Sequence, residues 1–306
     1  MKALAASLAV LCGSALVGAL ASSGAGATTP DWERVASLSQ RRSYAAAAAI
    51  DGRIYVAGGM VGETGRPLAT VSRYDPHRDA WQTLAPLPTA TRSLAGTAFR
   101  GRFVVAGGTT GAGNVATVLE LDPVRERWHA LAPLPSARFN HRLVALRGRL
   151  YALGGYDAGR ERRDVLVYDA RANRWTRGTP LPRPVHAFGA VAFHGEIWVV
   201  GGRRGEQVLR DVWIFDPRTG RWRAGPRMPR PMELLGLAVD GETLHAVSES
   251  VYQVYDARTG GWRDGPSPHV PRHALEAFVL GGALYALGGC TTALQDSPVV
   301  ERLRLD

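Results

Sequence analysis

Residues 53–59 read RIYVAGG, and this stretch decides the fold because its ending recurs at a fixed spacing along the 306-residue chain. It is a short apolar run, typical of a β-strand, that ends in the glycine pair Gly58-Gly59. The pair returns five times at steps of 49, 47, 47, 47 and 40 residues, as Gly107-Gly108, Gly154-Gly155, Gly201-Gly202, the degenerate Ser248-Glu249 and Gly288-Gly289. A repeat near ~50 residues is typical of β-propellers.

Tryptophans mark the same period independently of the glycines. They precede the glycine pairs and follow one another at the same steps of 49, 47, 47, 47 and 40 residues, as Trp32, Trp81, Trp128, Trp175, Trp222 and Trp262. Two markers that share one spacing predict six repeats, and each repeat of a propeller forms one blade.

The first repeat predicts a four-stranded antiparallel blade. Residues 43–50 form a small-residue strand, Asp51-Gly52 a tight turn and residues 53–59 a second strand. A third strand ends at Tyr74-Asp75, and Trp81 opens the fourth. A glycine after a polar residue suits a two-residue hairpin turn, because such turns require positive φ.

A glycine doublet followed by a spaced tyrosine and tryptophan resembles the kelch motif, and the resemblance covers residues 30–306. It implies an all-β fold, a single six-bladed β-propeller of four-stranded antiparallel kelch blades. Many kelch propellers are binding platforms for proteins or glycans. Others are enzymes, such as galactose oxidase and the exported bacterial N-acetylneuraminate epimerase (mutarotase).

The ends of the repeats predict how the ring closes. The last repeat stops at Leu305-Asp306, where a tryptophan should follow seven residues later, and the first begins at Asp31-Trp32 with no strand before it. We therefore expect the N-terminal strand to complete the C-terminal blade, which removes the open sheet edges of a linear stack.

Residues 1–27 read as a cleaved signal peptide. Lys2 precedes the apolar run 3–20, and the small residues 25–27 suit a cleavage site. A lipoprotein is the rival interpretation, but Cys12 comes too early and Leu11 replaces the required small residue. We expect a propeller over residues 28–306 that is periplasmic or secreted, with no membrane span.

One cysteine, Cys290, remains in the predicted mature chain, so no intramolecular disulfide is expected and we interpret it as a small buried residue. A single cysteine also gives no match to the copper site of galactose oxidase, which uses a thioether-linked cysteine. The sequence contains no catalytic or phosphate-binding motif, and we predict no cofactor and no metal. A metal held by His141, His186 and His273 is the alternative.

The chain carries a net charge of +10, and apart from Lys2 every basic residue is arginine. These arginines recur within each repeat instead of forming one basic stripe with interleaved aromatic residues, so we expect no nucleic-acid partner. The expected partner of this chain, taken as a monomer, is a protein or an acidic sugar or glycan.

Function should lie where the repeat varies, on the face that carries the loops after each glycine pair and the connections between blades. An arginine recurs in these connections. It could bind a ligand or could serve a structural role in the blade. The residue type at the position after it varies widely. Charged residues also replace alanine or glycine on two inner strands. The predicted ligand-binding residues are Arg42, Tyr44, Arg92, Arg138, Asn140, Arg142, His186, Glu233, Arg272, His273 and Glu276.

Blade five lacks the long loop after its degenerate pair, and the long loops of residues 156–162 and 203–207 lie beside this gap. We expect a cleft there, bounded by His186 and Glu233. These two residues are weak candidates for a catalytic acid–base pair. The sequence favours an exported binding module that uses this face. The alternative is a sugar-directed enzyme that resembles the mutarotase, whose acidic substrate an arginine-rich mouth would suit.

Overall fold

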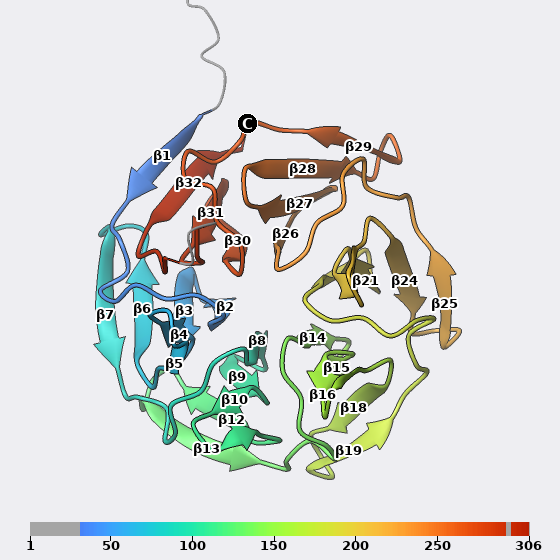
Figure 1. Ribbon diagram of the computed structural model, residues 1–306, viewed down its shortest axis with the longest axis horizontal. Helices are drawn as coiled ribbons and strands as arrows, with labels where there is room; N and C mark the ends of the chain where they lie inside the picture. The colour runs from blue at the N-terminus through green and yellow to red at the C-terminus, as the bar shows by residue number, and fades with distance from the viewer. Residues whose placement is uncertain (1–30, 292–294, 306) are drawn as a thin grey trace, which may run out of the picture.

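The computed structural model describes residues 31–291 and 295–305, so the predicted signal peptide lies outside the described part. Every regular element found there is a β-strand, and the strands form six four-stranded antiparallel blades around a central axis (Figure 1). The predicted all-β, six-bladed propeller is therefore confirmed. Within these residues, no helix is long and apolar enough to cross a bilayer.

The blades follow the chain, and each runs from an innermost to an outermost strand. Blade one comprises β2 (Ala46–Ile50), β3 (Arg53–Ala57), β6 (Val71–Asp75) and β7 (Ala80–Leu84). Blade two comprises β8 (Ala95–Phe99), β9 (Arg102–Ala106), β12 (Val118–Asp122) and β13 (Arg127–Leu131). Blade three comprises β14 (Arg142–Leu146), β15 (Arg149–Leu153), β18 (Val165–Asp169) and β19 (Arg174–Arg177).

The second half repeats this plan. Blade four comprises β20 (Gly189–Phe193), β21 (Glu196–Val200), β24 (Val212–Asp216) and β25 (Arg221–Ala224). Blade five comprises β26 (Gly236–Asp240), β27 (Thr243–Ser248), β28 (Val251–Asp256) and β29 (Gly261–Asp264). Blade six comprises β30 (Glu276–Leu280), β31 (Ala283–Leu287), β32 (Val300–Arg304) and β1 (Trp32–Val35).

The ring closes as predicted, because β1 pairs antiparallel with β32 and becomes the outer strand of blade six. Trp32 lies opposite Leu303 in this pairing and is 2% exposed. Its indole N–H donates to the carbonyl of Pro266 at 2.7 Å, which ties blade six to the connection from blade five. The N-terminal strand therefore fastens the last blade both within its sheet and to its neighbour (Figure 1).

We call the face that carries the loops after the glycine pairs and the inter-blade connections the upper face, and the opposite one the lower face. Within the described residues, four blades carry a small extra hairpin on the upper face. These are β4 (Met60–Val61) with β5 (Arg66–Pro67), β10 (Thr109–Thr110) with β11 (Gly113–Asn114), β16 (Tyr156–Asp157) with β17 (Arg160–Glu161), and β22 (Arg203–Arg204) with β23 (Gln207–Val208). Blade five has none, as expected from its missing loop, since β27 and β28 are joined by Glu249 and Ser250 alone.

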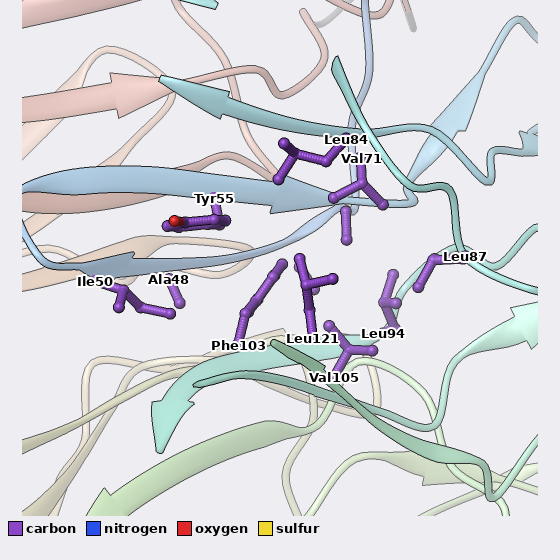
Figure 2. Close-up of a cluster of buried hydrophobic side chains, with 12 residues drawn as sticks. Ala48, Ile50, Tyr55, Val71, Leu84, Leu87, Leu94, Phe103, Val105 and Leu121 are labelled. Atoms are coloured by element: carbon purple, nitrogen blue, oxygen red, sulfur yellow. The ribbon is translucent and has the colours of Figure 1, made fainter. Parts of the chain in front are cut away.

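Apolar side chains fill the space between adjacent blades. Figure 2 shows the cluster between blades one and two, where Tyr55 of β3 lies against Phe103 of β9 with ring centroids 6.1 Å apart. Each of the other five interfaces has an equivalent cluster. Burial of this apolar area drives the blades together.

The glycine pairs permit the closest of these approaches. A Cβ atom at Gly58 would lie 2.5 Å from the carbonyl oxygen of Thr91 in the next blade, and its φ of +65° also favours glycine. The backbone N–H of Gly59 donates to that same carbonyl at 2.9 Å. The sequence prediction that the glycine pairs bring neighbouring backbones together is confirmed.

A closed ring of hydrogen bonds surrounds the axis at the upper face. Six equivalent residues, one per blade, have φ between 48° and 57°, and each backbone N–H donates to the carbonyl of its counterpart in the preceding blade at 2.6–3.2 Å. The members of this ring are Tyr44, Ser93, Asn140, Ala187, Leu234 and Ala274. The left-handed turn at Tyr44 also explains why β2 begins at Ala46 and not at the predicted residue 43.

Candidate functional site

Three of the recurring arginines lie inside the blades. Arg42, Arg138 and Arg272 are 0–1% exposed. Each donates through Nη1 to the carbonyl of the first residue of its own glycine pair, at 3.0, 3.2 and 2.7 Å respectively. Arg138 and Arg272 also pair with a carboxylate, at 2.6 and 2.7 Å. Their guanidinium groups therefore hold the loops after the glycine pairs in place, which is the structural role left open as the alternative to ligand binding.

Arg92 does not belong to this set. It forms a β-bridge with Thr109, in the place where Ser43 bridges Met60 and Phe139 bridges Tyr156. The structural equivalent of Arg42 is therefore Thr91, and the sequence alignment of blade two was shifted by one residue. Arg92 is half-buried, and its side chain donates through Nη1 to the sulfur of Met60 at 3.5 Å.

The varied positions of the inter-blade connections pair with the residues that follow the glycine pairs. Five such bridges stand around the upper face, at Ser43–Met60, Arg92–Thr109, Phe139–Tyr156, His186–Arg203 and His273–Cys290. The backbone pairing is the same each time while the side chains differ in charge, size and aromaticity. We call these bridged positions the rim. The propeller fold fixes the backbone of the rim but does not require any particular side chain there.

A hollow on the rim lies between the hairpins of blades three and four. Its volume is about 570 Å³, and we call it the groove. Nine residues line it: Phe139, Tyr156, Gly159, Arg160, Glu161, His186, Arg203, Gly205 and Glu206. The sequence predicted a cleft beside the loops of residues 156–162 and 203–207, bounded by His186 and Glu233. These loops form the β16–β17 and β22–β23 hairpins that wall the groove, and His186 lines it, whereas Glu233 is not among its lining residues.

Aromatic rings form one wall of the groove. The ring centroids of Phe139 and Tyr156 are 5.5 Å apart, and those of Tyr156 and His186 are 5.3 Å apart in an edge-to-face arrangement. Such contacts fix ring orientation, because the edge of one ring is positive and the face of the next is negative. Of the three, only His186 was among the ligand-binding residues predicted from the sequence. The replacement of Ser43 and Met60 by two aromatic residues at Phe139 and Tyr156 was the available signal.

The charged groups at the groove are arranged in pairs. Arg203 holds Glu233 in a bidentate contact, with Nε–Oε2 and Nη2–Oε1 distances of 2.7 and 2.8 Å. His186 Nδ1 lies 3.5 Å from Oε1 of Glu161. Burial lowers the pKa of His186 despite the opposing charges of Glu161 and Glu233, so the imidazole is neutral at pH 7. Glu233 is engaged by Arg203, and the pairing of His186 is with Glu161 instead of the predicted Glu233.

Two charged residues predicted to face the channel contact one another there. Arg142 Nη1 lies 2.6 Å from Oε1 of Glu276, and its other nitrogens donate to the carbonyls of Phe188 and Leu235, both at 2.9 Å. Below this pair, the small side chains of the inner strands line a cavity of about 290 Å³. The pair therefore lies across the channel just beneath the backbone ring of Tyr44 and its counterparts.

The three histidines considered for a metal lie apart. His141 is 2% exposed, with both ring nitrogens unpaired, and packs between Gly107 and Gly155. His273 Nε2 lies 3.1 Å from the sulfur of Cys290. No group of three or more His, Cys, Asp or Glu residues that could hold a metal occurs in residues 31–291 and 295–305.

The interpretation of Cys290 as buried is confirmed, since it is 2% exposed. Burial, together with the nearby charge of Asp296, raises the pKa of its thiol to about 11, against an opposing hydrogen bond from Ser43. A thiol of that pKa is protonated at pH 7, whereas reactive cysteines need the thiolate. Cys290 therefore has the surroundings of a structural cysteine.

Fold and rim together define a closed propeller with a side-chain-lined groove on its upper face. The family described as KLHDC2/KLHL20/DRC7 Kelch-repeats domain matches residues 46–252. The chain therefore belongs to the kelch-repeat family, whose propellers commonly bind proteins.

Individual relatives match over shorter stretches. Kelch-like protein 33 of Homo sapiens is 35% identical over 83 residues, which cover 27% of this chain and 15% of that protein. Kelch-like protein 35 of Homo sapiens is 38% identical over 82 residues, or 27% and 14% of the two chains. An F-box/kelch-repeat protein of Arabidopsis thaliana is 34% identical over 74 residues, or 24% and 19%. The chain thus aligns with less than a fifth of the length of these relatives.

Proposed function

We propose that this chain is an exported protein-binding module that holds its partner in the groove between the upper hairpins of blades three and four. The observation that carries the proposal is the aromatic wall of Phe139, Tyr156 and His186 beside a hollow of about 570 Å³. Tyrosine and other large rings supply much of the energy at protein interfaces, because they bury a large area with few rotatable bonds.

The remaining predicted site residues support the choice of the groove. Arg42, Arg138 and Arg272 are buried, and Tyr44 and Asn140 belong to the backbone ring. Arg142 and Glu276 contact each other beneath that ring. Side chains at the rim of the groove, in contrast, combine partial exposure with a concave surface, as binding sites usually do.

Export rests on the leader-like composition of residues 1–27. Expression of the full chain in a Gram-negative bacterium tests it: N-terminal sequencing of protein from the periplasm should read from Thr28. Recovery from the cytoplasm with an intact N-terminus would contradict export and leave the binding proposal standing.

A sugar-directed enzyme related to the mutarotase is the second candidate, favoured by the His186–Glu161 contact of 3.5 Å in the groove. A neutral imidazole beside a carboxylate can accept a proton from a sugar hydroxyl. The test follows the anomer exchange of N-acetylneuraminate by NMR. Faster exchange that is lost in His186→Ala would establish this activity, and an unchanged rate at high protein concentration would dismiss it.

Selection of peptides from a random library against the purified protein tests the binding proposal. Affinity for the selected peptides should fall at least about tenfold in Phe139→Ala and in Tyr156→Ala, because each loses an anchor worth more than ~1.4 kcal/mol. His194→Ala, at a tight turn on the lower face, is the control and should bind as the wild type does. Equal affinity in all four proteins would refute the proposed site.

A further inference from the structure

The groove contains a carboxylate without a cationic partner. The Glu161 side chain is 15% exposed and accepts the backbone N–H of Gly205 through Oε1. Among the described residues, no arginine nitrogen lies within 4.0 Å of its carboxylate. The one basic group described within that distance is His186, which burial keeps uncharged at pH 7. A carboxylate removed from water in this way is stabilised by a positive charge that comes close.

The other charges of the groove do not supply this positive charge. Arg203 is occupied by Glu233 at 2.7 and 2.8 Å, and its Nη1 lies 3.8 Å from Glu206. Arg160 is exposed on the β16–β17 hairpin. With His186 neutral, three carboxylates (Glu161, Glu206 and Glu233) stand against two guanidinium groups (Arg160 and Arg203), so the groove and its pairs carry a net charge of −1.

The aromatic ring of Tyr156 lies close enough to Glu161 that a cation bound by this carboxylate would also contact the ring. Tyr156 is half-buried, lines the same hollow and contacts His186, which is itself next to Glu161. The negative face of a tyrosine ring attracts an ammonium or guanidinium group within ~6 Å of its centroid. A carboxylate and an aromatic ring on one concave surface form a binding site for a basic side chain.

We infer that the groove receives a basic side chain, arginine or lysine, from the protein partner, with Glu161 as its counter-charge and Tyr156 as its aromatic wall. This inference rests on the proposed function, since it names the group of the partner that enters the groove. The Glu161 carboxylate would give a basic side chain a local counter-charge on a chain whose net charge of +10 disfavours a basic partner at longer range.

The test uses three small probes: the Nα-acetyl amides of arginine, lysine and citrulline. Citrulline has the shape of arginine without its charge. In NMR titrations at low salt, the arginine and lysine probes should bind at least fivefold more tightly than the citrulline probe. Raising NaCl from 50 to 500 mM should remove most of this difference, because salt screens a partly exposed charge pair.

Variants assign the binding to the groove. Glu161→Gln should abolish the preference for arginine over citrulline. The control Glu63→Gln, at an exposed carboxylate on the β4–β5 hairpin of blade one and outside the groove, should change it less than twofold. Tyr156→Phe should retain binding and Tyr156→Leu should weaken it, because phenylalanine preserves the aromatic face and leucine does not. Equal binding of citrulline and arginine, or no effect of Glu161→Gln, would overturn the inference.

The library peptides separate this inference from the function that it deepens. If they lose affinity in Tyr156→Ala but contain no essential basic residue and bind Glu161→Gln normally, the groove is a protein-binding site and the inference is wrong. If basic residues are required and replacement by citrulline weakens binding as much as Glu161→Gln does, both stand. If the peptides ignore the groove variants, both the function and the inference fail.

Discussion

Arg142 of blade three and Glu276 of blade six join opposite sides of the ring, with Nη1 and Oε1 2.6 Å apart. The same guanidinium group donates to Phe188 of blade four and Leu235 of blade five. One side chain therefore connects four of the six blades near the axis. Desolvation raises the pKa of Glu276 even though Arg142 opposes the shift, which shows that the carboxylate depends on its partner.

Replacing Arg142 by methionine should destabilise the propeller by about 2 kcal/mol, because it leaves the Glu276 carboxylate without a counter-charge inside the ring. The figure is below that for a fully buried pair, since both side chains are about one-fifth exposed. Urea unfolding measures the change. The double variant Arg142→Met/Glu276→Gln should recover part of the loss, and a double variant less stable than the single one would contradict this account.

Ala187→Gly should stabilise the protein by about 1 kcal/mol, because Ala187 has a φ of +57° in the backbone ring and only glycine adopts this region without strain. The melting temperature should rise by roughly 2 °C. Ala190→Gly on strand β20 is the matched control and should lower it, since glycine weakens an ordinary strand. A lower melting temperature for Ala187→Gly would show that the ring position carries no strain.

Trp32→Ala should cost about 3–5 kcal/mol, the usual range for truncating a fully buried large aromatic residue. Trp32 packs edge-to-face on Tyr252 of blade five at 5.8 Å and donates to Pro266. The equivalent Trp222 is only half-buried, and Trp222→Ala should cost clearly less. Thermal unfolding of the two variants compares them directly. Equal decreases in stability would mean that the closing strand of blade six contributes no more than an ordinary outer strand.

Stability should decrease on acidification because His245 is buried in blade five. Burial lowers the pKa of His245 from 6.5 to about 4, and its ring nitrogens contact Tyr252 and Thr243 at 2.7 and 3.0 Å. A lowered pKa means that the folded state binds fewer protons. The contribution of neutral His245 to the free energy of unfolding is thus fully present above pH 6.5. It is lost as the pH falls towards 4, and the loss is on the order of 3 kcal/mol.

Denaturant titrations of the wild type and His245→Gln between pH 7 and pH 4 test this assignment. The variant should start less stable and show a flatter pH dependence over this window, while the exposed His129→Gln should follow the wild-type profile. Parallel curves for the wild type and His245→Gln would mean that another group causes the loss.

The fold could be predicted from the sequence because the period, the glycine pairs and the tryptophans are all properties of one blade repeated six times. Ring closure followed from the terminal strands, since Trp32 had the spacing of an outer-strand tryptophan without the strands before it. Such features depend on local pattern, and a repeat shows that pattern several times over.

The site depended on features that a sequence pattern does not contain. Arg92 was aligned one residue away from its true equivalents, and one residue decides whether a side chain holds a loop or faces the rim. The contact between Arg142 and Glu276 joins residues 134 positions apart. The shape of the groove depends on how the β16–β17 and β22–β23 hairpins are held relative to one another. The backbone N–H of Gly205 donates to the Glu161 carboxylate across them, and a sequence pattern does not reveal this contact.

Hydrogen–deuterium exchange of the protein with and without a selected peptide tests the central claim most directly, because it reports which backbone amides the partner covers. The account predicts slower exchange at the hairpins of residues 156–161 and 203–208, with the tight turns of the lower face, such as Asp51-Gly52 and His194-Gly195, unchanged. Protection confined to those lower turns, or spread evenly over all six blades, would contradict it.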